Sequence, residues 1–91
     1  MYNGTDPSGY NPGLKKVPVI VSVSADGQMI PLYFSYGGKA FRLDRLASAQ
    51  TDCPPYLRYS CELTREDTVH RVELIYNTRE HAWLLDLGRC S

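Results

Sequence analysis

The sequence lacks an excess of charge of either sign. Its 91 residues include ten lysines and arginines and ten aspartates and glutamates, so the formal net charge is zero. A protein without net positive charge has no long-range field that would draw it to nucleic acid or to anionic lipid. Any binding of a polyanion must therefore depend on a local group of basic residues.

Long apolar segments are also missing. Residues 1–16 contain no apolar run of the kind found in a secretory signal, and no segment reaches the length of a membrane span. We therefore expect a cytoplasmic protein with no membrane partner. The short chain predicts a single domain with a modest core.

Cysteine is scarce, and motifs for metal or phosphate binding are absent. The three cysteines, Cys53, Cys61 and Cys90, are an odd number without the CxxC spacing of a zinc site. The glycine pair Gly37 and Gly38 is explained by a hairpin turn and not by a phosphate-binding loop. We therefore predict free thiols, no cofactor and no bound metal.

Helical periodicity is absent too, and apolar residues instead alternate with polar ones, which is typical of β-strands. The first half of the chain contains three such segments, at residues 17–25, 28–36 and 39–47. The second half contains three more, which begin at residues 56, 68 and 81. Pro54 and Pro55 interrupt regular structure, so we assign residues 48–55 to a linker.

Turn residues define the register of the first three strands. The pairs at residues 26–27 and 37–38 tolerate the positive φ angles of two-residue hairpin loops. Pro31 cannot donate a hydrogen bond to a neighbouring strand, so we expect a bulge or a bend near it. The predicted pairs, all apolar, are Val19–Phe34, Val21–Leu32, Val23–Ile30, Phe34–Phe41 and Leu32–Leu43.

The last three strands are paired through four-residue turns at residues 64–67 and 77–80. This register places apolar residues on one face and charge pairs on the other, which we expect to be an ordinary solvated surface. The predicted pairs are Leu63–Thr68, Cys61–His70, Tyr59–Val72, Leu57–Leu74, Tyr76–His81, Leu74–Trp83, Val72–Leu85, Arg58–Glu73 and Arg71–Asp86.

Each half therefore has one apolar face that must be covered, and packing the halves together covers both. We predict an all-β fold, a six-stranded antiparallel small barrel or sandwich made of two three-stranded meanders. The domain spans residues 17–88, with the first meander at 17–47 and the second at 56–87. A flexible N-terminal arm at 1–16 and a tail at 89–91 complete the chain.

The predicted neighbours Cys61 and His70 allow two kinds of chemistry. Both are zinc ligands and His81 lies one strand away, but a closed zinc site needs four ligands and the sequence offers no fourth. Cys61 as a nucleophile with His70 as its base is the second possibility, although inward-facing thiols are usually inert. We therefore predict that the protein is not an enzyme, and an enzyme with a Cys61/His70 site is the third alternative.

The outward face of the first meander combines small and apolar residues with little charge, which is typical of interface cores. We predict an interaction face for a protein partner or for self-association, and a function as a non-enzymatic interaction or accessory module. A small barrel that binds single-stranded nucleic acid through Tyr33, Arg42, Lys15 and Lys16 is the alternative. The predicted interaction face consists of Ile20, Met29, Tyr33 and Arg42.

About two-thirds of the chain resembles a group of small uncharacterised all-β proteins of Firmicutes. The resemblance lies in the string SADGQMIPLYFSYGGKAFRLDRL, in the later RYSCEL and in the aromatic strand at residues 82–85. Such proteins are often encoded near Y-family DNA polymerases, so the resemblance implies a link to DNA damage tolerance or to a mobile element. The matching residues are Ala25, Asp26, Gly27, Pro31, Leu32, Tyr36, Gly38, Lys39, Phe41, Leu43, Asp44, Arg45 and Leu46.

Overall fold

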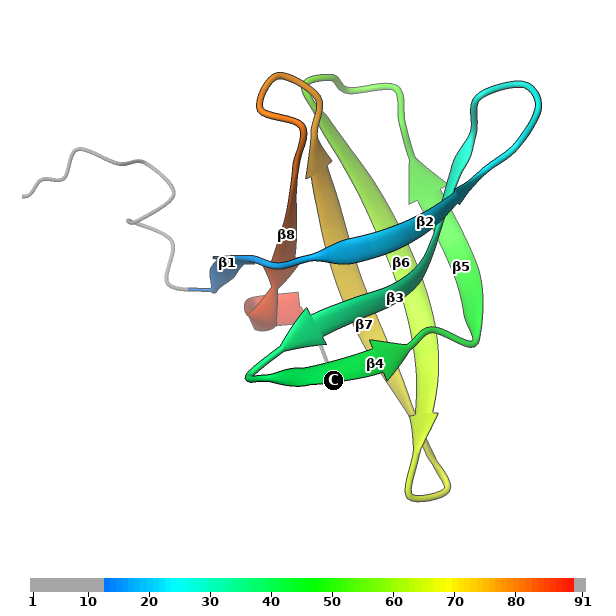
Figure 1. The fold of residues 1–91 in the computed structure, drawn as a ribbon, viewed down its shortest axis with the longest axis vertical. Helices are drawn as coiled ribbons and strands as arrows, with labels where there is room; N and C mark the ends of the chain where they lie inside the picture. The colour runs from blue at the N-terminus through cyan, green and yellow to red at the C-terminus, as the bar shows by residue number, and fades with distance from the viewer. Residues whose placement is uncertain (1–12, 90–91) are drawn as a thin grey trace, which may run out of the picture.

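Eight antiparallel strands form two sheets in the computed structural model, which describes residues 13–89 (Figure 1). The three-stranded sheet has the order β2-β3-β4, and the five-stranded sheet has the order β1-β8-β7-β6-β5. The predicted all-β fold of two packed antiparallel meanders is confirmed. The elements are β1 (Leu14–Lys16), β2 (Val19–Val23), β3 (Met29–Tyr36), β4 (Lys39–Arg42), β5 (Arg45–Gln50), β6 (Tyr56–Arg65), β7 (Thr68–Asn77), β8 (Ala82–Asp86) and the 3-10 turn η2 (Leu87–Arg89).

Eight strands are observed where six were predicted, because β1 lies in the predicted arm and the predicted strand 39–47 is divided into β4 and β5, with a bend at each place. The chain leaves β8 at Val17, whose N–H donates to the Trp83 carbonyl at 3.0 Å, and joins β3 at Pro18, whose carbonyl accepts from the Ser35 N–H at 3.1 Å. β1 and β2 are therefore two parts of one strand that passes from one sheet to the other.

The second bend lies at Leu43 and Asp44, between β4 and β5. The Leu43 N–H donates to the Leu32 carbonyl at 2.8 Å, and the Asp44 N–H donates to the Glu62 carbonyl at 2.8 Å. Backbone pairing thus continues from sheet to sheet at both corners, as in a small barrel. In Figure 1 the strands of the three-stranded sheet cross in front of the long strands β6 and β7.

Three predicted boundaries need correction. Residues 14–16, assigned to the arm, form β1, because pairing with β8 orders a segment that has no strand pattern of its own. Residues 48–50, assigned to the linker, belong to β5, and residues 87–89 form η2. The remainder of the predicted arm, residues 1–12, and residues 90–91 of the tail lie outside the described residues.

The β2–β3 hairpin contains two departures from the predicted register that cancel. Its loop has three residues, because the Ser24 N–H donates to the Gln28 carbonyl at 2.8 Å, and this shifts Val23 to a pairing with Met29. A bulge near Pro31, as predicted, then restores the register, and Val19 pairs with Phe34. The predicted pairs Val21–Leu32 and Val23–Ile30 are wrong, and Ile30 and Leu32 are exposed.

The β6–β7 and β7–β8 registers differ from the prediction by two residues. A two-residue turn at Glu66 and Asp67, with φ angles of 54° and 62°, replaces the predicted four-residue turn. Because the shift is even, each residue keeps its predicted face but gains a different neighbour. The observed pairs include Leu63–His70, Cys61–Val72, Tyr59–Leu74, Ser60–Glu73, Glu62–Arg71, Leu74–Leu85 and Tyr76–Trp83.

The core lies between the two sheets. Phe34 stacks on Phe41 with ring centroids 5.1 Å apart, and Trp83 contacts the rings of Tyr59 and Tyr76 at centroid distances of 5.3 and 5.0 Å. The predicted core positions of Phe34 and Trp83 and the exposed position of Tyr33 are confirmed. The buried members are Val17, Phe34, Leu43, Tyr59, Cys61, Leu63, Val72, Leu74 and Leu85.

Candidate functional site

The predicted interaction face is assembled in part. Ile20 pairs with Tyr33 and Tyr33 pairs with Arg42, so these three residues form one row across the outer side of the three-stranded sheet. Met29 is not in this row. The three-residue loop places Met29 beside Val23, and Ile30 takes the outward position that we had predicted for Met29.

Exposed apolar residues gather on the three-stranded sheet. Six of the eight large hydrophobic residues that are exposed in the described chain lie in it, so this sheet is the least covered part of the fold. The sequences of its strands contain the cations Lys39 and Arg42 and no acidic residue. A shallow hollow of about 220 Å³ lies beside Ile20 and Tyr33. The six residues are Ile20, Val23, Ile30, Leu32, Tyr33 and Tyr36.

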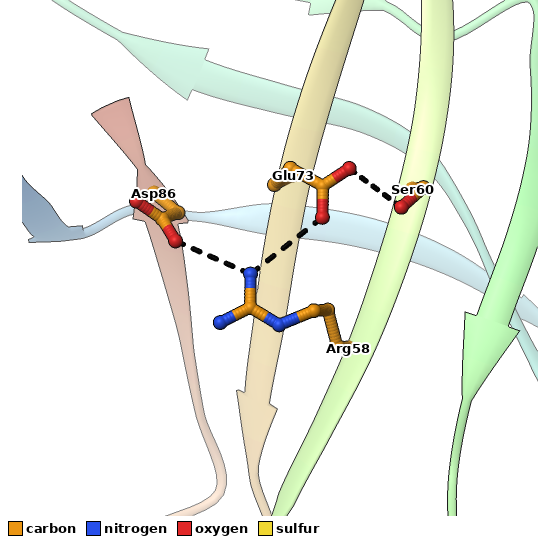
Figure 2. Close-up of polar contacts among 4 residues, drawn as sticks. All are labelled: Arg58, Ser60, Glu73 and Asp86. Atoms are coloured by element: carbon orange, nitrogen blue, oxygen red, sulfur yellow. Dashed lines mark hydrogen bonds and ion pairs between the residues drawn. The ribbon is translucent and has the colours of Figure 1, made fainter. Parts of the chain in front are cut away.

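The outer face of the five-stranded sheet is not the solvated surface that we predicted. Four of its residues, Glu73, Ile75, Leu84 and Asp86, are buried. Their burial follows from the register, because the long side chain of Arg58 on β6 reaches across β7 toward β8 (Figure 2). A row of paired residues crosses all five strands here, namely Lys16, Leu84, Ile75, Arg58 and Gln50.

One guanidinium group holds two buried carboxylates on this face. Arg58 Nη1 lies 3.2 Å from Asp86 Oδ2 and 3.6 Å from Glu73 Oε1, while the Ser60 hydroxyl donates to Glu73 Oε2 at 2.5 Å (Figure 2). The predicted Arg58–Glu73 contact is therefore present, although the two residues are diagonal neighbours. Arg71 and Asp86 are not the directly opposite pair that we predicted, because the β7–β8 register, with Leu74 opposite Leu85, is shifted by two residues; on β6, Arg71 pairs with Glu62.

A pocket of about 530 Å³ lies on this face beside the Arg58 cluster. This volume is within the range of small-molecule sites. Ile75 and Leu84 are its buried apolar residues, and Tyr56, whose side chain is exposed, also lines it. Residue patterns carried no signal for the pocket, because most of its lining residues come from five strands whose pairing depends on the corrected register.

Cys61 and His70 do not form the predicted pair. Cys61 pairs with Val72 and is fully buried, and His70 pairs with Leu63. Burial, followed by the nearby charge of Glu73, raises the pKa of the Cys61 thiol to about 11, so the thiol is neutral and unreactive near neutral pH. Within residues 13–89, no group of three or more His, Cys, Asp and Glu side chains is placed to hold a metal ion.

The buried thiol leads to a prediction about alkaline stability. The pKa of Cys61 is raised from the ordinary 9.0 to about 11. The stability that the neutral thiol contributes to the folded state is therefore complete below about pH 9 and is lost as the pH rises toward 11. The difference between the two pKa values corresponds to about 2–3 kcal/mol of folding free energy. Burial, and then Tyr76, also raises the pKa of Tyr59, which acts in the same direction.

Urea denaturation at a series of pH values measures this loss. In Cys61→Ala we expect the overall stability to be lower but the decline between pH 9 and 11 to be smaller than in the wild type. Parallel declines in the two proteins would show that Cys61 does not ionise in this range.

Comparisons with known proteins assign no role to either surface. No protein-family model, curated protein or solved structure matches the chain. No helix in the described part of the chain is long and apolar enough to cross a membrane. The resemblance to the Firmicutes proteins stays a prediction.

Proposed function

We propose that the protein is a non-enzymatic binding module that holds a partner protein on the outer face of β2, β3 and β4. The observation that supports this proposal is the exposure of Ile20 at 61% and Tyr33 at 40% in the same cross-strand row. When a second protein covers aliphatic and aromatic side chains that are exposed on a regular sheet, the free energy of the system falls, and this favours binding. The resemblance to proteins encoded near Y-family DNA polymerases would make the module an accessory factor in DNA damage tolerance.

The charges on this face favour a different protein over a second copy of the chain. In a two-fold symmetric contact, a patch meets its own copy. Lys39 and Arg42 would then approach the same cations, and the three strands supply no carboxylate to neutralise them. A partner with an apolar centre and acidic residues around it fits both the hydrophobic and the charged parts of the face.

Single-stranded nucleic acid would contact fewer of the exposed residues on this face than a partner protein would. Tyr33 and Arg42 could stack on a base, but the neighbouring exposed residues Ile20, Ile30 and Leu32 are aliphatic and offer no stacking surface. Binding of a single strand would also weaken steeply with salt, whereas binding through apolar contacts would not. The two functions can therefore be separated by the salt dependence of affinity.

The test begins with capture of partners from the native cell by the immobilised wild-type protein, identification by mass spectrometry, and calorimetry with the purified partner. We expect Ile20→Glu combined with Tyr33→Glu to weaken binding at least about tenfold. Val69→Glu is the matched control, because Val69 is as exposed, at 62%, but lies on β7.

Two results would contradict the proposal. One is equal affinity of the purified partner for wild type and for the Ile20→Glu, Tyr33→Glu variant. The other is binding of a single-stranded oligonucleotide that depends on Tyr33 and Arg42 and is lost at high salt. A wild type that is dimeric in solution, with the variant monomeric, would replace the partner protein by a second copy.

A further inference from the structure

The pocket on the five-stranded sheet is separate from the proposed protein-binding face and has the form of a small-molecule site. Its floor contains Ile75 and Leu84, which are 5% and 7% exposed and carry no polar side-chain atoms. Tyr56, at 54% exposure, offers an aromatic ring at the same pocket. An apolar floor beside an exposed ring suits a flat molecule, because the face that lies on the floor leaves water.

Arg58 lines this pocket, and its two ion pairs leave a pair of donors unused. Both of its ion pairs use Nη1, at 3.2 Å to Asp86 and 3.6 Å to Glu73, so Nε and Nη2 are the donors that can serve a ligand. Figure 2 shows both ion pairs made by one terminal nitrogen, with no contact drawn to the other. Because the guanidinium is planar and its position is fixed by two strands, it can donate in parallel to two adjacent acceptors of a ring.

The charges around the pocket oppose an anionic ligand. Arg58 already pairs with two carboxylates, those of Glu73 and Asp86, so its positive charge is largely offset. At the rim, Lys16 Nζ lies 3.7 Å from Glu80 Oε1, so this pair adds no net charge. Because both cations that line the pocket, Lys16 and Arg58, are paired with carboxylates, a phosphate or carboxylate would gain little, and we expect the ligand to be uncharged.

We propose that this pocket binds an uncharged planar heterocycle with two adjacent acceptors, which is the chemistry of a 6-oxopurine. The exocyclic carbonyl oxygen at C6 and the ring nitrogen N7 of such a base accept two parallel hydrogen bonds from one guanidinium. A 6-aminopurine places a donor where the oxygen stands, so it presents only one acceptor to Arg58. The proposal goes beyond the protein-binding function and does not depend on it.

The test is a titration of the full chain with inosine, adenosine and inosine monophosphate, followed by NMR and calorimetry. Inosine should bind with a Kd of about 1 mM or lower, and adenosine at least about tenfold more weakly. The phosphate of the monophosphate should not improve affinity at low salt. Shifts of the Ile75 and Leu84 amide signals, with β2 and β3 unaffected, would locate the ligand.

Two variants test the site itself. Arg58→Lys keeps the positive charge beside the carboxylates but removes the fork of donors, and we expect inosine affinity to fall about tenfold. Ile75→Trp should fill the pocket and abolish binding. Val69→Trp makes the same change on the same face of β7, outside the pocket, and should leave binding unchanged.

Several results would overturn the proposal. Absence of saturable inosine binding to the folded wild type would exclude the ligand class. Equal binding of inosine and adenosine, or full affinity in Arg58→Lys, would remove the role of the guanidinium. Tighter, salt-sensitive binding of the monophosphate would show that the site selects anions instead.

Discussion

Replacement of Phe34 by alanine is expected to lower the free energy of unfolding by about 3–5 kcal/mol. Phe34 is 5% exposed, stacks on Phe41 and belongs to the cluster that joins the two sheets. The alanine leaves a cavity that two crossing sheets cannot close without losing other contacts. Since small domains have only about 5–15 kcal/mol of stability, the variant will be largely unfolded at moderate temperature.

Urea denaturation followed by tryptophan fluorescence measures this effect, because Trp83 lies in the same core. Tyr33→Ala is the matched control, since Tyr33 precedes Phe34 in β3 and is 40% exposed. We expect the control to lose less than about 1 kcal/mol. If Phe34→Ala were as stable as Tyr33→Ala, the assignment of the two faces of β3 would be wrong.

Replacement of Arg58 by methionine is expected to lower the free energy of unfolding by about 3 kcal/mol. The change leaves Glu73 and Asp86, whose side chains are 8% and 12% exposed, without the cation that joins them. We choose the lower end of the usual range because Arg58 itself retains 31% of its side-chain exposure. Thermal and urea denaturation at neutral pH measure the loss.

Restoration of the charge balance provides the control. Adding Glu73→Gln and Asp86→Asn to Arg58→Met removes the two uncompensated charges, and most of the lost stability should return. Arg58→Lys should be more stable than Arg58→Met because the ammonium remains close to both carboxylates. A triple variant no more stable than Arg58→Met would mean that the packing of the Arg58 side chain, and not its charge, stabilises this face.

The alternation of apolar residues and the glycine turn predicted every strand except β1, and most of the inward faces, although Val23, Ile30 and Leu32 are exposed. Gly37 and Gly38, with φ angles of 61° and 78°, form the predicted two-residue turn, and Phe34 pairs with Phe41 as expected. The bends at residues 17–18 and 43–44 gave no such signal. They depend on hydrogen bonds between distant segments, which local residue patterns do not encode.

Turn chemistry explains why the remaining registers were wrong. In the β2–β3 loop, the Ser24 hydroxyl bonds to the Asp26 carboxylate and accepts from the Gln28 N–H at 3.0 Å, and this favours three residues over two. In the β6–β7 turn, Glu66 and Asp67 adopt the left-handed conformation without glycine, so composition did not indicate a tight turn.

These register errors also decided which parts of the candidate sites could be predicted. Ile20, Tyr33 and Arg42 lie where the two errors in the hairpin cancel, so they share one outer row as the predicted register implied, whereas Met29 lies beyond the bulge. Prediction of the pocket beside Arg58 would have required the correct pairing of all five strands of its sheet, β1, β8, β7, β6 and β5. Errors of two residues in the middle of that sheet were enough to hide it.

The pairing of β1 with β8 also bears on how a ligand would enter and leave. This contact joins the first and last strands of the described chain, and its three residue pairs close the longest loop in the fold. Such a contact forms late and opens early, whereas the ten-pair β6–β7 hairpin is local and persistent. Leu14 and Lys16 of β1 line the pocket. Local opening of β1 would therefore remove part of the pocket wall while the β6–β7 hairpin stays paired.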